Sequence, residues 1–356
     1  MKTGTMTTPL HGGKAPAWLF MRMQALAREI ISTIVIDFGT EELLKRLSEP
    51  LWFQALGCVL GFDWHSSGVT TTVCGALKAG INGRENELGL YICGGKGGRS
   101  RKTPEEIEGY CARIALAPQA LIRSSRLSAK VDNNALQDGY QLYHHAFFFD
   151  RQGRWSVVQQ GMNTEAHTAR RYHWTGIELK DYVEEPHSGI CTEDRVQSVF
   201  DLTARQSRDA RNASVEILKQ GPDSVLSELK KYKAYHMPRR HAVLLKDIHP
   251  DNIKKVLIQT YEQDPQDFTA LLEAKGAGPK TIRALALLSE IIYGTEVSRV
   301  DPAVFAFAHG GKDGTPYPVD KGVYDRSIQI LKTAVEQARI GDREKLAAMH
   351  KLARWR

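Results

Sequence analysis

The sequence predicts an α+β protein in which a mixed α/β N-terminal part is followed by an all-α C-terminal part. Runs of β-forming residues occur only before Cys191, whereas helical periodicity dominates from about Glu193 onward. A chain of 356 residues is also long enough for two domains. We therefore expect a boundary near residue 195, with a catalytic domain over residues 1–195 and a DNA-binding domain over residues 196–356.

The N-terminal part alternates helical and β-rich patterns. A Thr-Pro pair at Thr103 opens one of the helices, and the turn Asp150–Gly153 separates two β-rich runs that predict a hairpin. The helices we expect here cover residues 18–47, 103–116 and 124–143, and residues 51–61 are apolar all round and are expected to be buried. The strands we expect lie within residues 87–98, 144–162 and 172–179. If residues 124–143 are helical, Asn134, Gln137, Asp138 and Gln141 share one face.

Composition narrows the class of protein. No run of eighteen apolar residues occurs, so no membrane-spanning helix is expected, and the N-terminus lacks a secretory pattern. The five cysteines are scattered and form no C-x-x-C pair, which indicates free thiols in a cytoplasmic protein. A net charge of +7 and a pI near 9.0 fit a polyanionic partner.

The segment "AKGAGPKTIRAL" gives the strongest functional signal. Gly276 and Gly278 form a tight turn between two helical patterns, and the free amides at the start of the second helix suit a phosphate group. Lys275, Lys280 and Thr281 add charge and hydrogen bonding. Residues 267–292 resemble the helix-hairpin-helix element of DNA-binding proteins, which implies binding to double-stranded, nicked or branched DNA. The alternatives are a packed turn without a ligand, and RNA as the partner.

A catalytic alternative rests on the same turn. Lys280 and Asp301 resemble the lysine and aspartate of helix-hairpin-helix DNA glycosylases with lyase activity, in which the lysine is an amine nucleophile. The competing interpretation is structural, because Asp301 before Pro302 is also a natural helix N-cap.

Polar residues of the N-terminal part predict a second site. Carboxylate and imidazole groups are competent ligands for a divalent cation, and such a cation can assist phosphodiester hydrolysis. The candidate catalytic residues are Asp63, His65, Asp132, Asp138, Gln159 and His187. The candidate ligands for Mg²⁺ or Mn²⁺ are Asp63, His65, Asp132 and Asp138. A buried structural Asp–His pair is the alternative.

A basic, glycine-rich loop follows the first predicted strand. Lys96, Arg99 and Arg101 lie on it and are expected to contact phosphate, although a solvated basic loop is equally compatible.

Several segments together resemble one family. They include "WFQALGCVLGFDWHSSGVTT", "GGKGGRSRKTPEEI", "AKVDNNALQDGYQLYHH" and "AHGGKDGTPYPVDKGVYDRSI". The chain resembles a prokaryotic family known as domain of unknown function 763, which implies a cytoplasmic protein with a helix-hairpin-helix and no assigned reaction. The leading hypothesis is a metal-dependent nuclease of DNA repair or processing. The alternatives are a glycosylase/lyase and a non-catalytic DNA-binding protein, and a homodimer is a further expectation.

Overall fold

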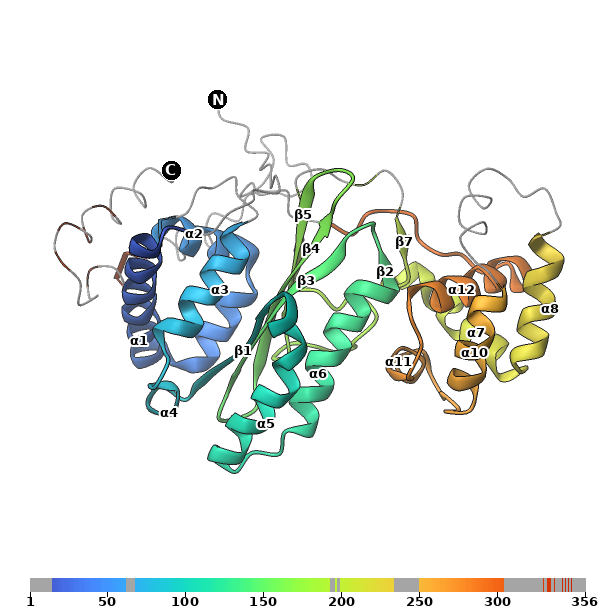
Figure 1. The fold of residues 1–356 in the computed structure, drawn as a ribbon, viewed down its shortest axis with the longest axis horizontal. Helices are drawn as coiled ribbons and strands as arrows, with labels where there is room; N and C mark the ends of the chain where they lie inside the picture. Colours follow the sequence, from blue (N-terminus) through green and yellow to red (C-terminus); the bar gives the residue numbers. More distant parts are fainter. Residues whose placement is uncertain are drawn as a thin grey trace.

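An antiparallel sheet with helices on both faces forms the centre of the molecule (Figure 1). The computed structural model describes residues 15–61, 68–192, 196, 199–233 and 250–303, with isolated positions between residues 329 and 347. Five strands pair in the order β1-β3-β4-β5-β6, and two short strands, β2 and β7, form a separate ladder. The predicted α+β class is confirmed, and the described C-terminal region is mostly helical.

The elements follow one another along the chain in alternating groups of helices and strands. The helices are α1 Ala17–Ser48, α2 Pro50–Val59, α3 Gly68–Gly80, α4 Glu85–Leu88, α5 Thr103–Ile114, α6 Gln119–Lys130, α7 Arg208–Lys219, α8 Pro222–Lys233, α10 Pro250–Tyr261, α11 Phe268–Glu273 and α12 Pro279–Tyr293. The strands are β1 Leu90–Lys96, β2 Leu136–Gln137, β3 Gln141–Asp150, β4 Trp155–Asn163, β5 Thr168–Thr175, β6 Gly189–Cys191 and β7 Phe200–Asp201.

The predicted hairpin is present as β3 and β4. Its turn contains Gly153 at a φ of 77°, in the left-handed region that glycine tolerates best. In-register pairing of Phe147 with Val157 and of Phe149 with Trp155 follows from this turn. Because successive side chains of a strand point to opposite faces, each strand contributes to two different cores.

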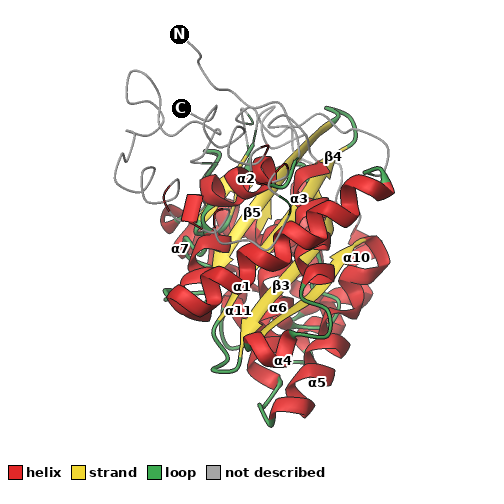
Figure 2. Cartoon of the chain, turned by 90° about the vertical axis from the view of Figure 1, so that its left-hand side faces the viewer, coloured by secondary structure: helices red, strands yellow, loops and turns green. Residues whose placement is uncertain are grey.

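The two cores lie on opposite faces of the sheet. Phe148 and Val158 pack against α1, α2 and α3, which lie in front of the strands in Figure 2. Phe147 and Trp174 belong to the second core, which includes α5 and α6 and continues into α7, α11 and α12. This second core crosses residue 195, so the two halves share one apolar interior. A boundary at that residue stays a prediction.

A short backbone ladder also joins the halves. The β2 residue Leu136 pairs with Asp201 of β7, and Asp201 in turn bridges to Ser298 after α12. The strand β7 was not expected, because two residues are too few to produce a recognisable β pattern.

One predicted helix is shorter than expected. Residues 124–143 do not form one helix: α6 ends at Lys130, a π-helical turn covers Val131–Ala135, and β3 has begun by Gln141. Gly139, between β2 and β3, adopts a φ of 87°. The polar residues that were expected to share a helical face are therefore distributed over a turn and two strands.

The first helix is long and partly exposed. Gly39 has non-helical angles and divides α1 into two segments. Trp18, Met21 and Ile36 are among its exposed apolar residues. Self-association through them stays a prediction. No described helix has the length and apolar character needed to cross a membrane. All five cysteines are free thiols.

Candidate functional site

Residues 267–292, where a helix-hairpin-helix element is predicted, contain α11, a short turn and α12, which we call the hairpin. Asp267 caps α11 by accepting a hydrogen bond from the Ala270 amide at 2.7 Å. In the turn, Gly276 has a φ of 93°, and an added Cβ would lie 3.0 Å from Gln259 Oε1. Gly278 is the N-cap of α12 and Pro279 occupies its first turn. The local signals in the sequence thus specify this geometry.

The hairpin turn presents its lysines to solvent. Lys275 and Lys280 are exposed, and Gly276 is exposed between them. Thr281 is 3% exposed, because it lies on the packed side of α12. The structure therefore does not place Thr281 where it would meet a nucleic-acid strand, whereas both predicted lysines remain accessible.

Side chains from the end of α6 hold the hairpin turn through its carbonyl groups. Lys130 Nζ donates to the carbonyl oxygens of Leu272 at 2.5 Å and Ala274 at 3.1 Å. Asn134 Nδ2 donates to the Ala277 carbonyl at 3.1 Å, and Gln137 Nε2 donates to that of Pro279 at 2.9 Å. Four carbonyl groups of this segment thus accept hydrogen bonds from one short stretch of chain.

The backbone amides of the same turn differ from its carbonyls in their hydrogen bonding. Among the described residues, no protein group accepts a hydrogen bond from the amides of Gly276, Gly278 or Lys280, and Pro279 has no N–H. The first N–H groups of a fifteen-residue helix carry partial positive charge, which favours an anion. Carbonyl groups of the turn are thus bonded to protein, while these amide N–H groups are available. A phosphate group requires N–H donors of this kind.

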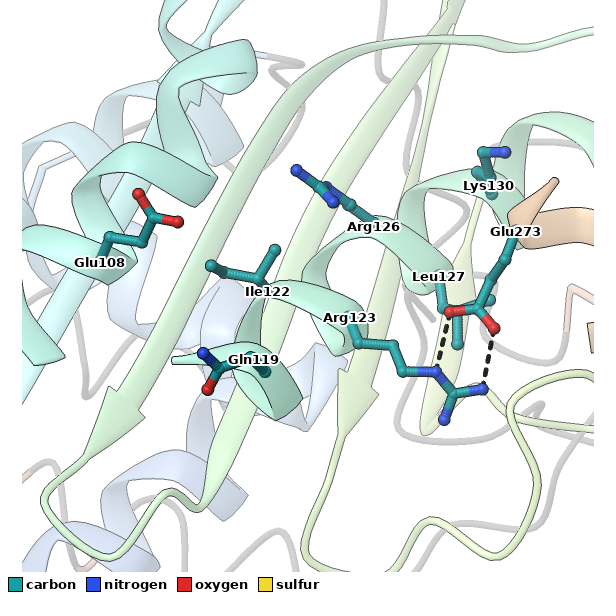
Figure 3. A pocket seen from close by; sticks show the side chains of 8 residues that line it. All are labelled: Glu108, Gln119, Ile122, Arg123, Arg126, Leu127, Lys130 and Glu273. Carbon is teal, nitrogen blue, oxygen red and sulfur yellow. Dashed lines mark hydrogen bonds and ion pairs between the residues drawn. The ribbon is translucent and has the colours of Figure 1, made fainter. Parts of the chain in front are cut away.

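A pocket of about 370 Å³ lies beside the hairpin, between α5, α6 and α11 (Figure 3). Arg123 forms a two-pronged ion pair with Glu273 at 2.8 and 2.9 Å. Arg126, one turn further along α6, is exposed and has no ion pair within the described part of the chain. Arg126 therefore adds a basic group to the α6 side of this pocket.

The π-helical turn Val131–Ala135 connects the hairpin to the interior of the sheet. Such turns occur often at functional sites, because the extra residue redirects the side chains that follow. Here Asn134 reaches the hairpin, while Asp132 is fully buried and reaches the sheet. Two neighbouring groups on one turn thus contact two different parts of the molecule.

Asp132 is the centre of a buried hydrogen-bond network. Its Oδ1 lies 2.5 Å from His187 Nε2, and its Oδ2 accepts from Gln159 Nε2 at 2.6 Å and Trp174 Nε1 at 3.0 Å. Burial raises the pKa of Asp132, and the nearby His187 opposes that rise. Three of the predicted catalytic residues, Asp132, Gln159 and His187, are therefore in direct contact.

The network continues to two residues that sequence reasoning missed. Gln159 Oε1 lies 2.8 Å from His145 Nδ1, and His145 Nε2 lies 2.9 Å from Ser125 Oγ. Because Gln159 presents its amide nitrogen to Asp132, its oxygen must accept from His145, which leaves Nε2 to accept the Ser125 hydroxyl proton. Burial lowers the pKa of His145 to about 4, so the ring is neutral at pH 7. Only the adjacency of "HH" to a predicted strand hinted at this role.

Asp138 belongs to a second, neighbouring group. It accepts from Tyr172 Oη at 2.7 Å, from Arg170 Nη1 at 2.9 Å and from the Tyr140 amide at 3.0 Å. Burial raises the pKa of Asp138, and the Arg170 guanidinium opposes that rise. Arg170 also forms a two-pronged ion pair with Asp301, at 3.0 and 2.6 Å.

Asp301 is thus part of the structure of the core. It is 5% exposed and accepts from the amides of Val196 and Ala303 in addition to Arg170. Lys280, its proposed partner in lyase chemistry, is an exposed residue on the hairpin. These positions favour the structural interpretation of Asp301 over the catalytic one.

The predicted metal ligands are only partly described. Asp63 and His65 lie outside the described residues. All four carboxylate oxygens of Asp132 and Asp138 accept from protein N–H or O–H donors, so these two residues do not fit as shared ligands of one cation. No group of three potential ligands occurs in the part of the chain that the structure describes.

The basic loop lies on other elements than the hairpin. Lys96 ends β1, and Arg99 and Arg101 lie on a single 3₁₀ turn, Gly97–Lys102, with all three side chains exposed. Lys96 also lies over the ring of Tyr143, 5.8 Å from its centroid. The loop can meet an anion, but it borders α5 and β3 and does not extend the hairpin surface.

The fold and these sites define a class: an α+β protein whose central antiparallel sheet carries a buried polar network, joined through a π-helical turn to a basic helical hairpin. No curated protein matches the chain, and no solved structure does. A family model does match, over residues 4–319. The chain belongs to the family described as "Protein of unknown function (DUF763)".

Proposed function

We propose that this protein binds the phosphodiester backbone of DNA through the turn between α11 and α12. One observation carries the proposal: Lys130, Asn134 and Gln137 hold the carbonyls of the turn, while its amides at Gly276 and Gly278 have no described protein acceptor. Exposed Lys275 and Lys280 flank those amides. Contacts of this kind position a duplex without reading its sequence.

The test measures binding as a function of salt. Each phosphate neutralised by a lysine contributes about 0.9 to the slope of log K against log salt. Fluorescence anisotropy with intact, nicked and branched duplexes should show salt-sensitive binding by the full chain. The double variant Lys275→Ala/Lys280→Ala should bind several-fold more weakly, with a slope smaller by about 2.

A charge-matched control separates local contact from net charge. Lys180 and Arg113 are exposed residues away from the hairpin, and Lys180→Ala/Arg113→Ala removes the same two charges. If both double variants lose equal affinity and equal slope, the protein binds through diffuse charge and the hairpin proposal is wrong. Single-stranded RNA in the same assay decides between the two nucleic acids, because phosphate contacts alone do not.

We further propose that the protein is an enzyme acting on phosphodiester bonds, with His187 as the group that accepts a proton from the attacking water. The observation that favours this is the Asp132–His187 hydrogen bond, located on the turn that also holds the hairpin. His187 Nδ1 has no partner among the described residues, and the carboxylate on Nε2 fixes the orientation of the ring. A nuclease requiring Mg²⁺ or Mn²⁺ is the form we propose first, with ligands other than Asp132 and Asp138, because their carboxylate oxygens accept from protein donors.

Cleavage of labelled nicked or branched DNA, with Mg²⁺, with Mn²⁺ and with EDTA, tests the enzyme proposal. His187→Gln should abolish turnover while DNA binding persists, and EDTA should abolish it if the cation is required. Binding without cleavage in every condition would contradict the enzyme proposal and indicate a non-catalytic DNA-binding protein. Borohydride trapping on damaged DNA tests the lyase alternative, which requires a covalent product lost in Lys280→Ala.

A further inference from the structure

The sheet face opposite the Asp132 network carries a row of polar side chains across four strands. Lys96 of β1 is paired with His144 of β3, His144 with Gln160 of β4, and Gln160 with Arg171 of β5. Residues directly opposite each other in an antiparallel ladder point to the same face. His144, Gln160 and Arg171 are each at most 4% exposed, whereas Lys96 is exposed at the edge of the row.

Arg171 shows which helices cover this row. Its guanidinium lies 2.9 Å from Gln54 Oε1 of α2 and 3.5 Å from Thr70 Oγ1 of α3, and 4.8 Å from the centroid of the Phe53 ring. Thr70 belongs to the first turn of α3, a helix of thirteen residues. The positive end of the α3 dipole and a buried guanidinium therefore meet at the same place.

His144 supplies an independent indication of a ligand. It is 2% exposed, and among the described residues neither of its ring nitrogens has a hydrogen-bond partner. Buried polar groups are nearly always paired, by protein or by a bound molecule. Burial lowers the pKa of His144 to about 3, so the ring is neutral and offers one donor and one acceptor.

We propose that the row His144–Gln160–Arg171, covered by the first turn of α3, is an anion-binding site that takes a phosphate group. The Arg171 guanidinium supplies positive charge while it keeps its contacts with Gln54 and Thr70, and the His144 imidazole supplies an N–H donor. The positive end of the α3 dipole adds to the charge. Lys96, Arg99 and Arg101 are exposed at its edge and raise the local concentration of anions. This site is separate from the hairpin and does not depend on it.

The full chain is titrated with inorganic phosphate. Binding is measured by isothermal titration calorimetry and by ¹⁵N NMR of labelled histidine. The wild-type protein should bind phosphate and shift the His144 imidazole signals. His144→Phe, which keeps the volume and removes the donor, should weaken binding about tenfold or more. Lys96→Gln should weaken it about two- to fivefold, because its charge is exposed. His167→Phe, on the exposed β4–β5 turn, is the matched control.

Two results would overturn the site: no phosphate binding by the wild-type protein, or unchanged binding in a folded His144→Phe variant. The exposed Lys96→Gln change keeps the test valid if His144→Phe fails to fold. Oligonucleotides with and without a 5′-phosphate identify the source of the group: an end-dependent gain in affinity, lost in Lys96→Gln, indicates a nucleic-acid terminus. Phosphate binding that survives in Lys275→Ala/Lys280→Ala separates this site from the hairpin.

Discussion

Replacing Asp132 by alanine and by asparagine should have very different consequences. Asp132 is fully buried and accepts hydrogen bonds from Gln159, Trp174 and His187. Alanine leaves three buried donors without an acceptor, and each orphaned group costs about 1–3 kcal/mol. Since such costs are not additive, we expect the free energy of unfolding to fall by about 3–5 kcal/mol.

Asparagine should be much milder because its two functional atoms fit the same partners. The amide oxygen can accept from Gln159 and Trp174, and the amide nitrogen can donate to the neutral form of His187. The change also removes a charge that burial disfavours, since burial raises the pKa of Asp132. We expect a loss of about 1 kcal/mol, with the stronger effect on any turnover that depends on His187.

Urea unfolding at pH 7.5, followed by tryptophan fluorescence, measures both changes. Trp174 donates to Asp132 and is buried, and it is one of six tryptophans whose combined emission follows unfolding. Equal losses in the two variants, or a loss below about 1 kcal/mol for alanine, would contradict the assignment of Asp132 as the acceptor of three buried donors.

Three further predictions follow from single contacts. Gly276→Ala places a side chain at a φ of 93° and should lower the free energy of unfolding by about 1 kcal/mol and also weaken DNA binding. Gly221→Ala, at a φ of 96° away from the hairpin, should lower the free energy of unfolding by a similar amount and leave DNA binding unchanged. Lys130→Met removes two hydrogen bonds to the turn and should increase hydrogen exchange at Lys275 and Gly276 with little change elsewhere; uniform protection would contradict it. His144 has a pKa lowered from 6.5 to about 3 by burial, so the unfolded chain binds a proton that the folded chain excludes as the pH falls below 6.5. His144→Phe should therefore flatten the acid side of the stability profile by about 1.4 kcal/mol per pH unit between pH 6 and 4, and parallel urea-denaturation profiles would contradict this.

Local features of the molecule could be predicted from the sequence because their causes are local. Gly153 between two β-rich runs specifies the β3–β4 turn, and Gly276 followed by Pro279 specifies the α11–α12 hairpin. Exposure of Lys275 and Lys280 also follows from composition, because a basic turn between short helices has few ways to be buried. These features depend mainly on backbone torsion angles that the glycines and the proline set locally.

The partners of the polar residues were decided only by tertiary structure. Asp132 meets His187, 55 positions away, and Arg170 meets Asp301, 131 positions away. Sequence spacing placed Asp138 on a helical face, whereas α6 ends at Lys130 and a π-helical turn follows, from which Asn134 donates to the Ala277 carbonyl. Chain-local rules fix which torsion angles a residue adopts, but a hydrogen bond between distant segments exists only once both cores have packed against the sheet.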